Sequence, residues 1–171
     1  MSVAGKKVLM VLPPTGFEEE EYDKTRKILE GKGAKVTVAS VHEGEVRGEK
    51  GMIVKSTAVV GDVKVYDYDA IVFVGGEGAR NVFEHEKVLK LAKDADHKVL
   101  GAISNATVIL ANAEVLKEKK ATGDRRMARW IEARGGRYTG QPVQVDEKIV
   151  TADGPNSVVL FGNALAEVLG K

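Results

Sequence analysis

The chain has 171 residues, which is enough for one domain with a full hydrophobic core but too few for two, so we expect a single domain over residues 1–171. Its 26 Lys and Arg residues nearly balance its 25 Asp and Glu residues, and a net charge of +1 argues against nucleic acid or an acidic membrane surface as a partner. The absence of cysteine excludes disulfides, thiolate metal sites and cysteine nucleophiles, and it agrees with a cytoplasmic location.

Strand and helix patterns alternate along the chain. The order is a strand at 6–12, a helix at 18–33, a strand at 34–41, short alternating runs at 44–60, a strand at 69–76, an amphipathic helix at 79–96, a strand at 98–103, helices at 105–116 and 124–136, two strands within 142–154 and a closing helix at 157–170. The first apolar run is too short for a membrane span, and no cleavage pattern follows it, so we predict a strand there and not a signal peptide. Abundant Lys, Glu and Arg with few Gln and Asn favour a heat-adapted source.

Strands separated by helices need crossover connections, which predicts an α/β fold with a mainly parallel sheet and helices on both faces. In this architecture ligands bind beyond the carboxyl ends of the strands. Three such ends carry candidate residues: PPTGFEEEE after the first strand, GGEG after residues 69–74 and SNAT after residues 98–103.

The apolar run Val99–Ile103 stops at Ser104, and a helical pattern follows at once. A sharp strand-to-helix turn is where many α/β enzymes hold a nucleophile, and the small flanking residues Ala102 and Ala106 suit such a turn. Serine is also among the best helix N-caps. Three interpretations therefore stay open for Ser104: an active nucleophile, a degenerate site that holds a ligand, or only a cap.

A serine nucleophile needs a positioned base, which is usually histidine. The chain has His42, His85 and His97, and none is obviously placed to serve Ser104. No group of His, Asp and Glu shows convincing metal-ligand spacing, and the GGEGA segment lacks the spacing of a dinucleotide fingerprint, so we predict neither a metal nor a cofactor.

Several segments together resemble the DJ-1/PfpI (ThiJ/PfpI) superfamily, in the right order and over nearly the whole chain. They are GFEEEEY, DYDAIVFVGGEGA, GAISNATVILANAEVLKEKKAT and TADGPNS. The resemblance implies a flavodoxin-like three-layer sandwich and a homodimer or larger homo-oligomer. It also implies a nucleophile elbow that faces a glutamate from the loop after the first strand.

The resemblance places serine where the family usually has its reactive cysteine, at Ser104. The PfpI-like branch has a histidine next, and this chain has Asn105. That branch also recruits an acidic residue near the position of Arg80, and the DJ-1-like branch often has a histidine after the residue that matches Thr122, where Gly123 stands here. The scaffold is therefore kept, while the reactive group and its expected bases are missing.

The retained acid would be Glu21, with Glu18 one turn earlier, although acidic residues also suit the first turn of a helix without any site. Gly75 and Gly76 allow close backbone approach, and the Gly76 and Asn105 amides resemble the family's oxyanion hole. An ordinary tight turn would explain the glycine pair equally well. Asn105 either lines the site or is solvated in the first helical turn.

Two hypotheses follow. The first is a family member that has lost the cysteine chemistry and either binds a small carbonyl or anionic ligand or serves as an oligomeric module. The rival is a hydrolase or glyoxalase-like enzyme that uses Ser104, the Gly76 and Asn105 amides and Glu21 as proton acceptor. Redox sensing by cysteine is excluded by composition.

Overall fold

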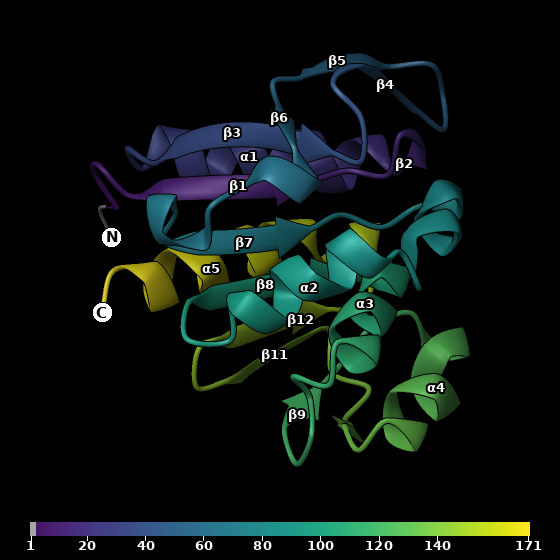
Figure 1. Ribbon diagram of the computed structural model, residues 1–171. Helices are drawn as coiled ribbons and strands as arrows, with labels where there is room; N and C mark the ends of the chain where they lie inside the picture. Colours follow the sequence, from purple (N-terminus) through teal and green to yellow (C-terminus); the bar gives the residue numbers. More distant parts are fainter. Residues whose placement is uncertain (1–2) are drawn as a thin grey trace.

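The computed structural model describes residues 3–171 and is built around a seven-stranded sheet (Figure 1). The strand order is β11-β12-β8-β7-β1-β3-β6. Every neighbouring pair is parallel except β11–β12, which forms an antiparallel hairpin at one edge. The strands are β1 (Lys7–Val11), β3 (Lys35–Ser40), β6 (Ala58–Val59), β7 (Ala70–Phe73), β8 (Val99–Ile103), β11 (Val143–Asp146) and β12 (Ile149–Ala152).

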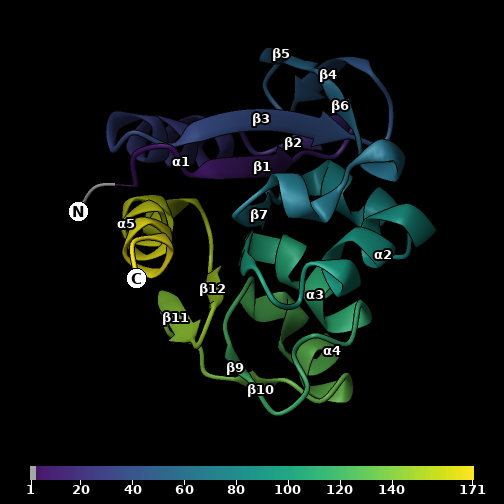
Figure 2. The same cartoon turned by 60° about the vertical axis from the view of Figure 1, so that its left-hand side comes forward.

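Helices cover both faces of this sheet, as the alternating pattern predicts (Figure 2). One face carries α1 (Glu19–Gly31) and α5 (Val158–Leu169), which pack against each other. The other face carries α2 (Glu86–Asp94), α3 (Thr107–Asn112) and α4 (Ala128–Ala133). The two buried apolar clusters lie on opposite faces of the sheet, and its central strands β7 and β8 are buried along their whole length. The predicted flavodoxin-like α/β sandwich is therefore confirmed.

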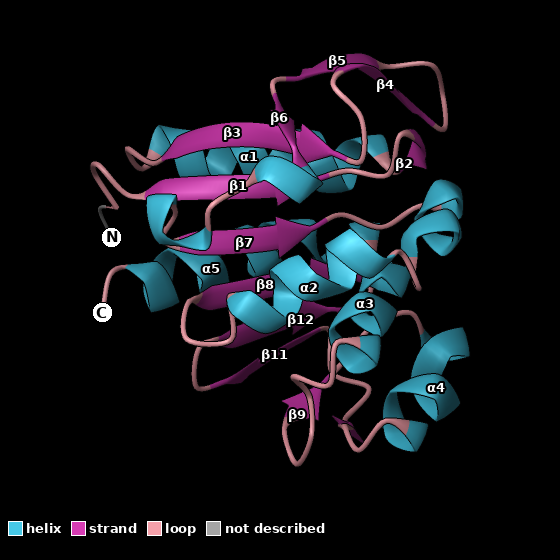
Figure 3. Ribbon diagram, viewed as in Figure 1, coloured by secondary structure: helices cyan, strands magenta, loops and turns pink. Residues whose placement is uncertain are grey.

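Two predicted helices are shorter than the sequence pattern suggests (Figure 3). Residues 79–96 form a 3₁₀ segment, η3 (Glu77–Val82), and then the separate helix α2. A continuous helix would place Glu86 on the same face as the buried Val82 and Phe83. Burying the charge of Glu86 there would be unfavourable, so the helix does not continue through this point. The helix predicted at 105–116 consists of η4 (Ser104–Ala106) and α3, and it ends at Asn112.

The remaining short elements lie outside the main sheet. They are β9 (Lys120–Ala121) and β10 (Arg137–Tyr138), which pair with each other, and the 3₁₀ segments η1 (Val60–Asp62), η2 (Val65–Asp67), η5 (Arg125–Met127) and η6 (Pro155–Ser157). None of the helices within residues 3–171 combines the length and the apolar character of a bilayer span.

The predicted antiparallel excursion is a hairpin of β4 (Gly44–Gly48) and β5 (Ile53–Ser56), and β2 (Thr15–Phe17) pairs with β4. The carboxylate of Glu19 holds the turn between β4 and β5 in place. Glu19 Oε2 accepts hydrogen bonds from the backbone N–H groups of Lys50 at 2.7 Å and Met52 at 3.2 Å. The hairpin is thereby attached to the first turn of α1.

We expect Glu19→Ala to destabilise the protein by about 2–3 kcal/mol, because it leaves the two turn N–H groups without their charged acceptor. Glu19→Gln keeps an acceptor oxygen and should cost clearly less. Urea denaturation of both variants measures the difference in their free energies of unfolding. Faster amide hydrogen exchange of residues 48–52 in Glu19→Ala would locate the destabilisation at the hairpin turn. Equal stability of Glu19→Ala and wild type would show that the attachment is energetically unimportant.

Candidate active site

Ser104 stands at a strained turn between β8 and η4. Its φ is +65°, which is the left-handed region that residues other than glycine rarely adopt. A Cβ on Gly75 would lie 2.9 Å from Ser104 Cβ, and a Cβ on Gly123 would lie 2.9 Å from the Ser104 carbonyl oxygen. The Asp124 N–H donates to that same oxygen at 3.0 Å. The chain therefore holds the serine in the elbow conformation and keeps glycine on both sides of it.

Glu21 lies in the first turn of α1 and is fully buried. Its Oε1 accepts the Gly75 N–H at 2.9 Å, and the Ser104 hydroxyl is a second hydrogen-bonding neighbour of the carboxyl. Burial, followed by the charges of Glu18 and Glu49, raises the pKa of Glu21 from 4.5 to about 8, while the Gly75 N–H and the Ser104 hydroxyl act in the opposite direction. At neutral pH the carboxyl is therefore protonated and cannot accept the proton of Ser104.

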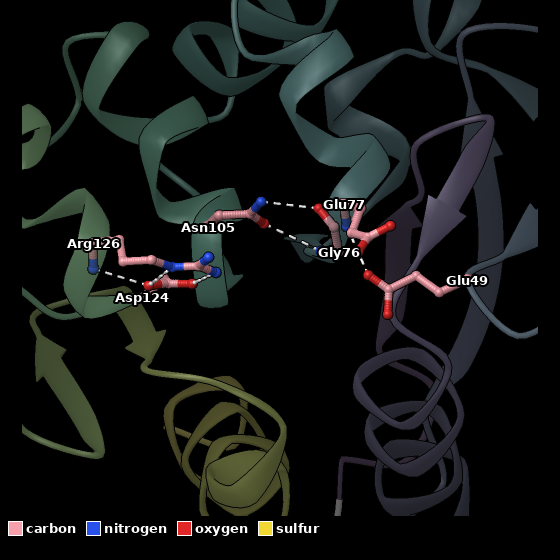
Figure 4. Close-up of polar contacts among 6 residues, drawn as sticks. All are labelled: Glu49, Gly76, Glu77, Asn105, Asp124 and Arg126. Carbon is pink, nitrogen blue, oxygen red and sulfur yellow. Dashed lines mark hydrogen bonds and ion pairs between the residues drawn. The ribbon is translucent and has the colours of Figure 1, made fainter.

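The side chain of Asn105 closes one half of the predicted oxyanion hole. Its Oδ1 accepts the Gly76 N–H at 3.1 Å, and its Nδ2 donates to the Gly76 carbonyl at 2.9 Å (Figure 4). The carboxamide thus pairs with both polar groups of one residue, as a backbone peptide would. The Gly76 N–H, one of the two amides that the resemblance assigns to an oxyanion hole, thus donates to the chain's own Asn105 in this structure. Asn105 is also buried and not solvated.

These residues surround one cavity of about 520 Å³, which we call the elbow cavity. Its lining residues are Glu18, Glu21, Glu49, Gly76, Glu77, Arg80, Ser104, Asn105, Asp124, Arg126, Met127 and Pro155. Five of the six residues predicted from the sequence line it, and Gly75 lies behind Glu21 and Ser104. Glu18 also caps α1 by accepting the Glu21 N–H at 2.8 Å.

No histidine among residues 3–171 lines the elbow cavity. His42 follows β3, His85 precedes α2, and His97 precedes β8 at the end far from Ser104, next to Asp96. Within the described chain, Ser104 therefore lacks the base on which serine catalysis depends. Among residues 3–171, no cluster of three or more His, Cys, Asp or Glu side chains is arranged to hold a metal ion.

Five charged residues that line the elbow cavity were not among the predicted site residues: Glu49, Glu77, Arg80, Asp124 and Arg126. Glu49, in the turn between β4 and β5, accepts the Glu77 N–H at 2.7 Å and so joins the hairpin to η3. Asp124 and Arg126, which follow β9, form two side-chain hydrogen bonds at 2.7 and 3.1 Å. Asp124 lies just beyond the end of β9, two residues after Thr122, so an inspection of the residues that follow each strand could have identified it. The position of Glu49 depends on how the hairpin folds back.

Comparisons with known proteins identify the family of the chain. The DJ-1/PfpI family model matches residues 6–168. A Methanocaldococcus jannaschii protein without an assigned function is 35% identical over 170 residues, covering 96% of this chain and 83% of that protein. A deglycase of Thermococcus kodakarensis is 26% identical over 163 residues, covering 94% of this chain and 98% of that protein.

A solved structure shares the fold almost completely. The ThiJ/PfpI domain protein from Brachyspira murdochii superposes with a TM-score of 0.93 at 32% identity, covering 97% of this chain and 98% of that one. The family model and these similarities each cover nearly the whole chain. The chain belongs to the DJ-1/PfpI family.

Proposed function

We propose that this protein is a DJ-1/PfpI family member whose elbow site holds a small ligand without forming a covalent bond to it. The observation that carries the proposal is the pairing of the Asn105 carboxamide with Gly76, which occupies an amide that an oxyanion would need. Paired amide donors contribute much of the stabilisation in acyl-transfer chemistry, so the loss of one is costly to catalysis.

Two further observations support a non-catalytic site. Ser104 has no histidine beside it in the cavity, and serine without a base is a weak nucleophile. Glu21 is the nearest acid, but its raised pKa keeps it protonated at neutral pH. Nucleophile, base and oxyanion donor are therefore all impaired, while the cavity and the strained turn are kept.

The assembly and location of the protein are part of the same proposal. We expect a cytoplasmic homodimer or larger homo-oligomer, without nucleic acid or membrane as a partner. The adjacent side chains of Val159 and Leu160 on α5 are more than half exposed, and they provide apolar surface for self-association. Light scattering at several protein concentrations measures the assembly size.

The second candidate function is a serine-dependent hydrolase or a glyoxalase- or deglycase-like enzyme. The positive φ of Ser104 favours it, because strain of this kind is often kept at working sites. The similarity to a protein named as a deglycase points the same way. This candidate needs a base that the described chain does not place in the cavity.

Labelling and turnover separate the two functions. We expect wild type and Ser104→Ala to be equally inert toward a serine-reactive phosphonate and toward methylglyoxal. Ser104→Cys should react with iodoacetamide at one position only, because the natural chain has no cysteine. The double change Ser104→Cys with Asn105→Ala should turn over methylglyoxal at least about tenfold faster than Ser104→Cys alone, since the Gly76 donor is released.

Wild-type labelling or turnover that disappears in Ser104→Ala would replace the first proposal by the second. Asn105→Ala alone is the matched control, because it opens the Gly76 amide without a thiol and should stay inert. Thermal unfolding of each variant shows whether lost activity reflects lost structure.

A further inference from the structure

A second, smaller cavity lies beside the elbow cavity, and we call it the aromatic cleft. Its volume is about 180 Å³, and its lining residues are Arg80, Phe83, Glu84, Met127 and Trp130. Arg80 and Met127 line both cavities, so these two side chains form a wall that the cavities share. The aromatic cleft therefore lies next to any ligand that the elbow cavity holds.

The aromatic wall of the cleft is held in place by one buried side chain, that of Asn112 at the end of α3. Its Oδ1 accepts the Trp130 Nε1–H at 2.8 Å, and its Nδ2 donates to the Phe83 carbonyl oxygen at 2.8 Å. The rings of Phe83 and Trp130 meet edge to face, with their centroids 5.6 Å apart. Two rings from different parts of the chain are thus fixed relative to each other before any ligand binds.

Trp130 keeps part of its ring open to the cleft. Its side chain is 36% exposed, whereas Phe83 is 4% and Met127 is 6% exposed. Because the indole N–H is already bonded to Asn112, the exposed part of the ring is apolar surface. An apolar cavity of about 150 Å³ accepts benzene, so the aromatic cleft has room for one planar ring.

The charge on the wall between the two cavities is that of Arg80. No hydrogen bond or ion pair engages its guanidinium group within residues 3–171. Its neighbour Asp124, whose pKa is lowered by the Arg126 hydrogen bonds and to a smaller extent by the charge of Arg80, is already paired with Arg126. Glu84, the other charged residue of the cleft, is exposed and forms no ion pair with Arg80. The guanidinium of Arg80 is therefore available to an anionic group.

The carboxylates of the elbow cavity lie away from the aromatic cleft. Glu18, Glu49 and Glu77 line the elbow cavity and not the cleft. Glu18 accepts the Glu21 N–H and Glu49 accepts the Glu77 N–H, so both are bonded to backbone donors. Figure 4 shows Glu49 and Glu77 on the side of the cavity opposite Asp124. An anionic group beside Arg80 therefore avoids most of the acidic lining.

We infer that the aromatic cleft and the adjoining end of the elbow cavity bind a small arylalkyl carboxylate, with its ring against Trp130 and its carboxylate on the Arg80 guanidinium. The planar fork of a guanidinium suits the two oxygens of a carboxylate. Burial of the ring contributes affinity, and Arg80 selects the charge of the ligand. This inference rests on the proposed ligand-holding function and names its ligand class.

The aromatic cleft can be observed directly, because Trp130 is the single tryptophan of the chain. Its fluorescence is titrated with phenylacetate, phenylacetamide, phenethylamine and acetate, which vary the charge and the ring separately. We expect phenylacetate to give a saturable change and to bind about fivefold tighter than phenylacetamide, since a charged acceptor strengthens its hydrogen bonds to arginine. Phenethylamine should bind more weakly than the amide, and acetate should give no saturable change.

Two variants test the role of Arg80. Arg80→Gln should abolish the preference for phenylacetate over phenylacetamide and leave the affinity for the amide nearly unchanged. Arg129→Gln is the matched control, because it removes an exposed charge from the same helix as Trp130 and should keep the preference. The methyl resonance of Met127 gives a second readout and should move with phenylacetate in wild type and in Arg129→Gln.

Equal binding of phenylacetate and phenylacetamide overturns the inference, and so does tighter binding of phenethylamine or the absence of any saturable change. A change of Trp130 emission on dilution of the protein without a probe would show that a second copy covers the cleft, which also overturns it. These outcomes do not depend on turnover and leave the labelling test of the proposed function intact. If wild type proves catalytic while phenylacetate still binds beside Trp130, this inference stands and the non-catalytic proposal falls.

Discussion

The protein is expected to lose stability as the pH rises from about 4.5 to about 8, and Glu21→Gln is expected to remove this loss. The folded state raises the pKa of Glu21 from 4.5 to about 8, so between these values the folded state holds a proton that the unfolded state has released. Stability falls with pH wherever the folded state binds more protons. At about 1.4 kcal/mol per pKa unit, the whole shift is worth of the order of 5 kcal/mol.

Glutamine keeps the side-chain oxygen that accepts the Gly75 N–H and cannot ionise. Above pH 8 we therefore expect Glu21→Gln to be more stable than wild type, with the two closest together below pH 4.5. Urea denaturation at pH 4.5, 6, 7.5 and 9 gives both curves. The difference between them isolates Glu21, because the other titrating groups are shared. Parallel curves would show that Glu21 ionises normally in the folded protein.

Gly78→Ala is expected to destabilise the protein by about 4 kcal/mol or more, or to prevent folding. A Cβ at Gly78 would lie 1.6 Å from the Thr15 carbonyl oxygen and 2.7 Å from its carbon, so β2 and η3 would have to separate. Both obstructing atoms belong to the backbone and cannot turn away. The clash would also disturb the turn at Gly76, which precedes η3 and lines the elbow cavity.

Gly154→Ala is the matched control for this substitution. A Cβ there would have no atom within 4 Å, and the φ of 169° is extended backbone that alanine adopts. We expect its free energy of unfolding to stay within about 0.5 kcal/mol of wild type. Soluble yield and urea denaturation compare the two variants, and comparable stability of both would contradict the close approach of β2 and η3.

The sequence predicts the framework of this protein because its strands are continuous apolar runs and its turns carry glycine. Both the β4–β5 and the β11–β12 hairpins follow from such patterns. The break near His85 was missed because Val88, Leu91 and Ala92 continue a helical spacing after the interruption. A short 3₁₀ segment leaves little trace in a periodic pattern.

In the candidate site, too, one part follows from the sequence and another does not. Position at the carboxyl ends of β1, β7 and β8 is enough to bring Glu21, Gly76 and Ser104 together, since parallel strands end at one edge of the sheet. Which side-chain oxygen accepts each backbone N–H depends on tertiary side-chain geometry, and a local stretch of sequence does not determine that geometry. The pairing of Asn105 with Gly76 and the reach of Glu49 to η3 belong to this second kind.

The two-point contact between Asn105 and Gly76 determines how many substitutions this site needs to gain thiol chemistry. A mutation that placed cysteine at position 104 would put a thiol beside a Gly76 N–H that the Asn105 side chain already occupies. A change at position 105 alone would release that N–H without supplying a thiol. A thiol beside a free Gly76 donor therefore needs both changes together, and no single substitution at either position produces it.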